Sequence, residues 1–264
     1  EKTFSLPGEH LNEALTFLFE GVYQNAVVYL NGEKIAEHRY GYTEFTADAT
    51  GKVRAGENTL RVTVDNSLEP NSRWYTGSGI YRPVRLLVGN KVYLPQDTVR
   101  ITTREADEGF ALLDVTAQVQ SASTVTERVT LQQTICRKGT AVLTDRQNLL
   151  LQPGESRTVS FRYCVDSPAL WSPENPNLYT STMQVLEGEE ELDREETGFG
   201  IRTLSIDAAH GVRINGQTVK LRGACIHHDN GILGAATLPD AEERRIRQLK
   251  AVSYTHLRAH ETLM

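Results

Sequence analysis

Apolar and polar residues alternate with a period of two along most of the first 203 residues of this chain. In residues 60–64 aliphatic side chains alternate with an arginine and a threonine, and residues 84–88 repeat the pattern. Successive side chains of a β-strand point to opposite faces, so this period is typical of half-buried strands. Turn-forming residues separate the runs, and Asn31-Gly32 tolerates the positive φ angles of a tight hairpin turn. The sequence therefore predicts sandwiches or barrels built from many short strands.

Two β units follow one another in this part of the chain. The first closes near Tyr93-Leu94-Pro95. The second, residues 95–203, holds about seven predicted strands in roughly 105 residues, the number and size of an immunoglobulin-like sandwich. It lacks the cysteine–tryptophan–cysteine core of antibody domains. The chain's three cysteines predict free thiols, with a bridge between Cys136 and Cys164 as the alternative and Cys225 as a small buried residue.

After residue 203 the pattern changes to strand, loop and helix. A second Asn-Gly hairpin at Asn215-Gly216 leads into an apolar strand, residues 221–226, and a glycine-rich loop. A helix is predicted from Pro239, with acidic residues in its first turn, where they complement the positive helix end. Ile246 and Leu249 are expected to form its buried stripe. One βα unit cannot bury its own strand, so this region predicts the start of a third domain.

The charge and hydropathy of the chain exclude two classes of partner. A formal net charge of −6 and a pI near 5.7 argue against a nucleic-acid partner, because nucleic-acid-binding domains carry a basic face. No apolar run approaches the roughly 20 residues of a membrane-spanning helix, so no membrane contact is predicted. The acidic run at residues 187–196 is interpreted as a solvated hairpin edge rather than as a calcium site.

Six stretches resemble glycoside hydrolase family 2, the family of β-galactosidases, β-glucuronidases and β-mannosidases. They are FEGVYQNAVVYLNGEKIAEHRYGYTEFTADAT at 19–50, GENTLRVTVDN at 56–66, NSRWYTGSGIYRPVRL at 71–86, LWSPENPNLYT at 170–180, GFGIRTLSID at 198–207 and INGQTVKLRGACIHHD at 214–229. The resemblance follows the family's own order and covers residues 1 to about 252. It implies a mainly β fold: a jelly-roll, an immunoglobulin-like sandwich, and the first βα unit of a truncated TIM barrel.

On this resemblance the chain is expected to divide into four parts. Residues 1–94 form a jelly-roll of the sugar-binding type, incomplete at its N-terminus, and residues 95–203 the immunoglobulin-like sandwich. Residues 204–252 begin the catalytic barrel. Residues 253–264 depart abruptly from the family pattern, and we interpret them as a tail that is not native.

The resemblance implies a retaining exo-β-glycosidase, with β-galactosidase as the first expectation and β-glucuronidase or β-mannosidase as alternatives. In the family, one glutamate forms a covalent glycosyl intermediate and another, in an Asn-Glu pair on a later barrel strand, is the acid and base. The single Asn-Glu dipeptide, Asn12-Glu13, lies in the first β unit, far from any barrel strand in the sequence. No catalytic residue is therefore expected here, and the chain as given is predicted to be inactive.

Substrate-binding residues are expected in two places. His227-His228-Asp229 falls at the carboxyl end of the first barrel strand, where TIM barrels carry their active sites. His228 is the first choice for a sugar contact, and each histidine could instead tie the loop to backbone. In the jelly-roll loop, Asn71, Arg73 and Trp74 are the candidates. Arg73 offers a planar fork of donors, and Trp74 either stacks on a pyranose or anchors the core.

The remaining expectations concern ligands, location and rival functions. No metal or other cofactor is predicted in this chain, although family members often bind magnesium or sodium. A carbohydrate resembling a β-galactoside is the expected partner. A parent protein could form a homo-oligomer. Its compartment is left open, with the cytoplasm and the periplasm of a bacterium as the two candidates. A non-catalytic carbohydrate-binding module is the main rival, against which the barrel-like motif at residues 222–229 counts. A structural array of sandwiches would require repeats between the two β units.

Overall fold

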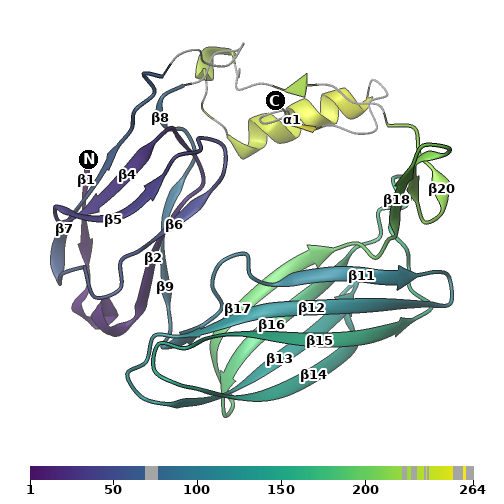
Figure 1. Cartoon of the computed structure of the whole chain (residues 1–264), viewed down its shortest axis with the longest axis horizontal. Coiled ribbons are helices and arrows are strands. Elements are labelled where there is room, and N and C mark those ends of the chain that lie inside the picture. Colours follow the sequence, from purple (N-terminus) through teal and green to yellow (C-terminus); the bar gives the residue numbers. More distant parts are fainter. Residues whose placement is uncertain are drawn as a thin grey trace. The chain divides into compact units, whose positions relative to one another are not determined.

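The computed structural model describes residues 1–68, 77–221, 225–226, 231–234, 236, 238–251 and 258–259, with only the backbone at 225–226 and 258–259. The chain divides into two compact units, Glu1–Val88 with Leu221–Met264, and Gly89–Lys220. Figure 1 shows that the described strands dominate both units. No described helix is long and apolar enough to span a membrane.

The first unit contains a jelly-roll of two facing sheets. Their strands are β1 (Lys2–Leu6), β2 (Ala14–Phe19), β4 (Ala26–Leu30), β5 (Glu33–His38), β6 (Phe45–Asp48), β7 (Gly56–Thr63) and β9 (Val84–Gly89). One sheet has the order β1-β7-β4-β5 and the other β6-β2-β9. A short 3₁₀ helix, Gly8–Asn12, follows β1, and β3 (Val22–Tyr23) pairs with β8 (Gly79–Ile80). The predicted sandwich of many short strands is thus confirmed.

The inward side chains of these sheets form one apolar core. Leu15, Phe19, Val28 and Leu30 are almost fully buried in it. The alternation that predicted strands therefore places large side chains between the sheets, the burial that drives folding. The hairpin predicted at Asn31-Gly32 joins β4 to β5, with φ angles of 52° and 89°. These positive angles are the ones that an Asn-Gly turn supplies at little steric cost.

The second unit contains the immunoglobulin-like sandwich. Its strands are β10 (Val92–Tyr93), β11 (Arg100–Ala106), β12 (Phe110–Ser121), β13 (Glu127–Arg137), β14 (Thr140–Leu151), β15 (Ser156–Asp166), β16 (Tyr179–Glu187) and β17 (Glu190–Phe199). The strand β12 pairs with β10, β11 and β15 in one sheet, and the other sheet has the order β14-β13-β16-β17. Cys136 and Cys164, which lie in different sheets, are free thiols.

Strict alternation along β12 positions the core of this sandwich. Leu113, Val115 and Ala117 are fully buried, while the residues between them are partly exposed. The opposite sheet contributes Leu131 and Ile135 from β13. Gln133 lies between these two and is also fully buried, and its Nε2 donates to Ser181 Oγ at 2.9 Å. A buried amide is tolerated because this partner offsets part of its desolvation.

A small sheet extends the second unit beyond the sandwich: β18 (Leu204–Asp207), β19 (Gly211–Ile214) and β20 (Gln217–Thr218). Asn215, in the predicted Asn-Gly turn, fastens it to the sandwich. Its Nδ2 donates to the Trp171 carbonyl and its Oδ1 accepts from Thr203 N–H, both at 3.0 Å. The Arg202 guanidinium lies over the Trp171 ring, 4.5 Å from its centroid. Polar and cation–π contacts therefore hold the strands that follow residue 203 against the sandwich.

The C-terminal segment contains β21 (Cys225–Ile226), a 3₁₀ turn (Gly231–Leu233), α1 (Pro239–Ala251) and β22 (Arg258–Ala259). The helix begins at the predicted Pro239. Its expected buried stripe is wrong: no described residue of α1 is buried, and Ile246 is 46% exposed. The strands β21 and β22 pair in parallel, with Cys225 opposite Arg258. Strand, helix and parallel strand form the crossover unit from which α/β folds are built.

Candidate functional site

The two ends of the jelly-roll loop predicted to contact sugar are joined by described residues. Asn66 Nδ2 donates to Ser78 Oγ at 2.8 Å, across the loop's base. Gln24 Nε2 in turn donates to Asn66 Oδ1 at 3.2 Å. Asp65 accepts from the backbone N–H and the hydroxyl of Ser67 at 2.9 and 2.6 Å, and these bonds lower the pKa of its carboxyl. A polar network therefore fixes where the loop leaves and re-enters the sandwich.

An aromatic side chain and two glycines shape the sandwich beside this loop. Tyr81 follows β8, and its hydroxyl donates to the carbonyl of Gly41 at 2.8 Å. The Tyr81 ring lies against Gly21, where an added Cβ would be 2.6 Å from the ring. Arg82 lies over the Tyr81 ring at 5.6 Å. Gly21 is thus required for the close approach of the Tyr81 ring to the backbone, as Gly41 is for the Tyr23 ring, which lies 2.1 Å from an added Cβ there.

The six residues predicted to bind sugar lie outside the described residues. They are Asn71, Arg73, Trp74, His227, His228 and Asp229. The elements around them are described: Asn66 and Ser78 flank the first group, and β21 ends immediately before the second. Because β21 and β22 are parallel, residues 227–229 follow the carboxyl end of a strand in a parallel pair. That is the edge where barrels and open α/β sheets carry ligands.

Two carboxylates in the immunoglobulin-like unit have raised pKa values. Burial raises the pKa of Glu195 to about 7, and the neighbouring Asp97 and Asp193 add to the shift. Burial likewise raises the pKa of Asp193, although its carboxylate accepts the Leu94 N–H at 2.7 Å. The interpretation of the acidic run as wholly solvated is therefore wrong for these two residues. The bond from Leu94 N–H gives Asp193 a structural role, because it ties residue 94 to β17.

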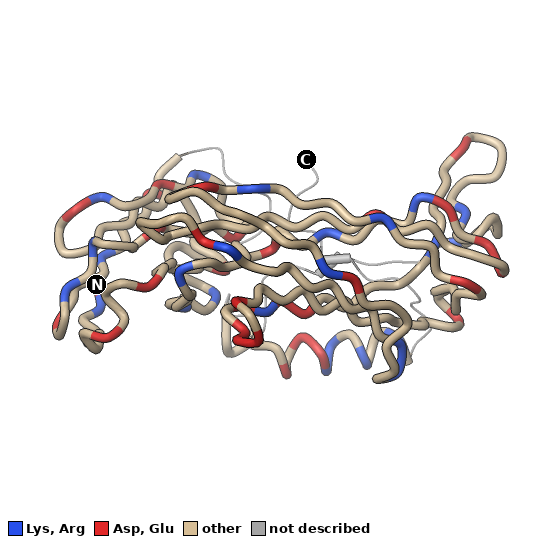
Figure 2. Tube along the Cα trace, turned by 90° about the horizontal axis from the view of Figure 1, so that it is seen from below, with Lys and Arg blue, Asp and Glu red and all other residues tan. Residues whose placement is uncertain are grey.

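Metal-binding geometry is not found in the part of the chain that the structure describes. Within those residues no group of three or more His, Cys, Asp or Glu side chains converges to hold an ion. Figure 2 shows that basic and acidic residues are interspersed along the described strands. The described chain thus presents mixed charge rather than a patch of one sign.

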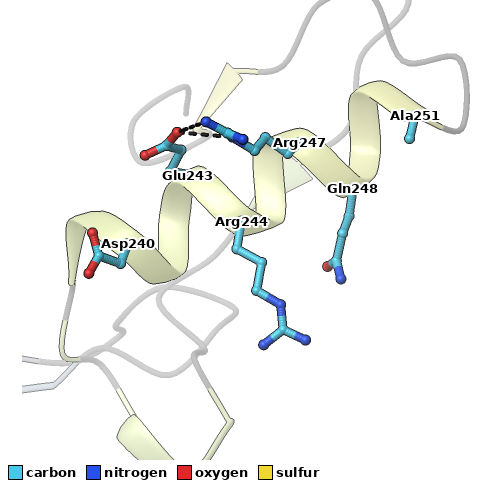
Figure 3. A pocket seen from close by; sticks show the side chains of 6 residues that line it. All are labelled: Asp240, Glu243, Arg244, Arg247, Gln248 and Ala251. Carbon is cyan, nitrogen blue, oxygen red and sulfur yellow. Dashed lines mark hydrogen bonds and ion pairs between the residues drawn. The ribbon is translucent and has the colours of Figure 1, made fainter.

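Hollows in the described surface occur on α1 and in the jelly-roll. The first is lined by six residues of one helix, Asp240, Glu243, Arg244, Arg247, Gln248 and Ala251. Figure 3 shows them along a face of α1, with Glu243 paired to Arg247. The second, of about 450 Å³, lies beside β1 and β9, and its apolar lining includes Phe4, Phe17 and Val84. It is an opening into the sandwich core at two sheet edges.

Comparison with known proteins identifies the family. The sequence model of the glycosyl hydrolase 2 galactose-binding domain-like family matches residues 1–111, and that of glycosyl hydrolases family 2 matches residues 92–202. The β-galactosidase BoGH2A of Bacteroides ovatus is 36% identical over 259 residues, or 97% of this chain and 30% of that protein. The chain belongs to glycoside hydrolase family 2. Its fold class and family, predicted from the motifs, are therefore confirmed.

Two further relatives define how much of the family architecture is present. A putative β-glucuronidase of Formosa agariphila is 33% identical over 97% of this family 2 chain and 24% of its own length. The crystal structure of a family 2 member from Bacteroides cellulosilyticus has a TM-score of 0.91 and 36% identity, covering 99% of this chain and 36% of that one. This family 2 chain thus spans about a third or less of these relatives.

Sequence reasoning missed two features of this family 2 chain. The pairing of β22 with β21 lies in the segment interpreted as a tail that is not native. That interpretation predicted no second parallel strand. The burial of Asp193 and Glu195 had a weaker signal, since only their period-two spacing along β17 places both on one face.

Proposed function

We propose that the chain is the N-terminal part of a retaining exo-β-glycosidase that hydrolyses β-galactosides. The observation that carries the proposal is the order of its parts: two consecutive family 2 matches, then a parallel strand–helix–strand unit. A free carbohydrate-binding module would have no use for that last unit. The 36% identity to a β-galactosidase of Bacteroides ovatus favours a galactoside as substrate.

The proposed sugar subsite has two walls. His228, with His227 and Asp229, belongs to the wall that follows β21. A neutral imidazole can donate to one hydroxyl and accept from another, while a carboxylate accepts two. Asn71, Arg73 and Trp74 belong to the jelly-roll wall, in the loop whose base is closed by the bond between Asn66 and Ser78. That bond fixes the two described ends of the loop, which supports assigning the loop to the subsite.

The 264 residues by themselves are proposed to be inactive. A retaining glycosidase requires two carboxyl groups about 5–5.5 Å apart, one as nucleophile and one as acid and base. The described carboxyls with raised pKa values, Asp193 and Glu195, lie on β17 of the immunoglobulin-like unit, where Leu94 and Thr197 are their partners. They are not offered as the catalytic pair.

The alternative substrate is a β-glucuronide, favoured by the 33% identity to a putative β-glucuronidase. A β-mannoside remains the third choice within the family. The two leading substrates differ at C6, where a glucuronide carries a carboxylate that requires a cationic or donor-rich contact. Relative kcat/KM on the two glycosides therefore decides between them.

The test uses the chain and a longer protein containing it, each assayed with p-nitrophenyl β-D-galactoside and β-D-glucuronide. We expect no turnover by the chain, and a higher kcat/KM on the galactoside by the longer protein. His228→Ala in the longer protein should lower kcat/KM at least about tenfold, a loss of about 1.4 kcal/mol. His210→Ala, at an exposed histidine in the β18–β19 turn, is the matched control. Preference for the glucuronide, or turnover by the chain, would refute the corresponding part of the proposal.

A further inference from the structure

Three tyrosine rings form a series from the jelly-roll core to its surface: Tyr23 of β3, then Tyr42 and Tyr40 in the connection between β5 and β6. Tyr23 is 5% exposed, Tyr42 is half-buried and Tyr40 is 45% exposed. The rings of Tyr23 and Tyr42 have centroids 5.1 Å apart, and those of Tyr42 and Tyr40 are edge-to-face at 5.9 Å. Both distances fall in the range of favourable aromatic pairs. An exposed ring is thus supported from below by two others.

The backbone of this aromatic turn, residues 39–44, is held in place. Tyr81 donates its hydroxyl to Gly41 O, and the Tyr23 ring packs so close to Gly41 that an added Cβ would lie 2.1 Å from it. His38 Nε2 and Thr43 Oγ1 are 2.9 Å apart and hydrogen-bonded across the turn. Since these contacts exist without a ligand, the exposed ring of Tyr40 would lose little conformational freedom on binding.

Arg39, the residue before Tyr40, carries a polar group that could reach ligand hydroxyls. The Arg39 side chain is 86% exposed, and its Nε lies 3.8 Å from Glu37 Oε1, a distance too long for a hydrogen bond. Its guanidinium therefore keeps a planar fork of donors available to a ligand. A pyranose presents an apolar face of C–H groups, ringed by hydroxyls. The exposed ring of Tyr40 and the donor fork of Arg39, in successive residues, offer a partner for each feature of such a sugar.

From this geometry we propose that the aromatic turn is a carbohydrate contact, with one pyranose unit of a glycan stacked on Tyr40 and hydrogen-bonded by Arg39. The class of ligand rests on the proposed function, whereas the location rests on the turn itself. The turn belongs to the domain matched by the galactose-binding domain-like model. Tyr40 is better suited to binding a ligand than to packing in the core, because nearly half of its surface is exposed to water.

The experiment is affinity electrophoresis of the full 264-residue chain in gels that contain soluble β-galactan, with parallel gels that contain a glucuronate-bearing polysaccharide. We expect at least one polysaccharide to retard the chain. Tyr40→Ala should weaken that binding about tenfold, or about 1.4 kcal/mol. Tyr40→Phe should preserve it, because the ring face is kept. Arg39→Ala should weaken it by a smaller factor.

Phe110→Ala removes another exposed aromatic ring, 38% exposed, from the other unit and is the matched control. Unchanged circular dichroism would show that each variant is folded. Absence of retardation of the wild-type chain in both gels overturns the proposal, as does equal binding by Tyr40→Ala. Neither result depends on the hydrolysis assays of the longer protein. Failure of this binding proposal is therefore distinguishable from failure of the proposed glycosidase activity.

Discussion

The sandwich strand β12 and the helix α1 were both predicted from amphipathic patterns, yet their apolar faces have different surroundings. Leu113, Val115 and Ala117 of β12 are fully buried, whereas Ile246 of α1 is 46% exposed. The difference lies in the partners. A facing sheet of four strands covers β12, while the hollow on α1 is lined by residues of that helix alone. An amphipathic pattern thus specifies which face can be buried, and the surrounding chain decides whether it is.

The largest expected effect tests this difference directly. Leu131→Ala removes a fully buried side chain of β13 and should lower the free energy of unfolding by about 2–5 kcal/mol, since it leaves a cavity. Ile246→Ala, on the exposed face of α1, should change it by less than about 0.5 kcal/mol. Urea unfolding followed by circular dichroism measures both. Equal costs would mean that α1 is buried in solution and would break the comparison.

A second test asks how tightly the sandwich unit is packed at its C-terminal end. A Cβ added at Gly200 would lie 2.7 Å from the Trp171 ring, whereas nothing lies within 4 Å of one added at Gly198. Gly200→Ala should therefore destabilise the unit by about 1–3 kcal/mol through overpacking. Gly198→Ala should be neutral or slightly stabilising. Thermal unfolding of the two variants measures the contrast, and equal melting temperatures would show that Trp171 moves aside freely.

The smallest expected effect concerns the two half-buried carboxylates of β17. Glu195 has a folded pKa of about 7, above its ordinary value of 4.5, so the folded state holds the proton more tightly than the unfolded state. Stability is consequently lost as pH rises from about 4.5 to 7. Glu195→Gln should remove this loss and stabilise the chain at pH 8 by about 1 kcal/mol, after allowance for solvent screening.

At pH 4 the same variant should match the wild type, because both side chains are then neutral. Glu196→Gln is the control. The Glu196 side chain is 57% exposed, and its Oε1 lies 3.9 Å from Arg194 Nη1, a long distance for an ion pair. Denaturant unfolding at the two pH values measures the difference. A Glu195→Gln effect that is independent of pH would show that the carboxyl is solvated like its neighbour.

The strands of the sandwich were the most predictable part of the molecule. The alternating runs at residues 60–64 and 84–88 fall largely on β7 and β9 of the jelly-roll, and eight strands form the immunoglobulin-like sandwich, for which about seven were expected. Strand periodicity is a local property of the chain, so one sequence suffices to find it. The two Asn-Gly turns were equally readable, since positive φ angles at both positions favour that dipeptide.

Features that depend on distant partners were not predictable in the same way. Asp193 is half-buried because Leu94, which is 99 positions away, donates its N–H to it. Nothing in the local pattern of β17 reports that contact. The sugar contacts expected at residues 71–74 and 227–229 came from the resemblance to glycoside hydrolase family 2, and they stay predictions. The aromatic turn is different again: its tyrosines were within a family motif, and only their graded exposure indicated a surface role.

The double hydrogen bond of Asn215 has a consequence for where a gene encoding this region can be cut. A truncation after codon 203 would delete Asn215, leaving the Trp171 carbonyl and the Thr203 N–H without their partner. A truncation after codon 220 would retain both bonds and the whole β18–β20 sheet. The working boundary of this module for protein engineers is therefore marked by one asparagine rather than by the last strand of the sandwich.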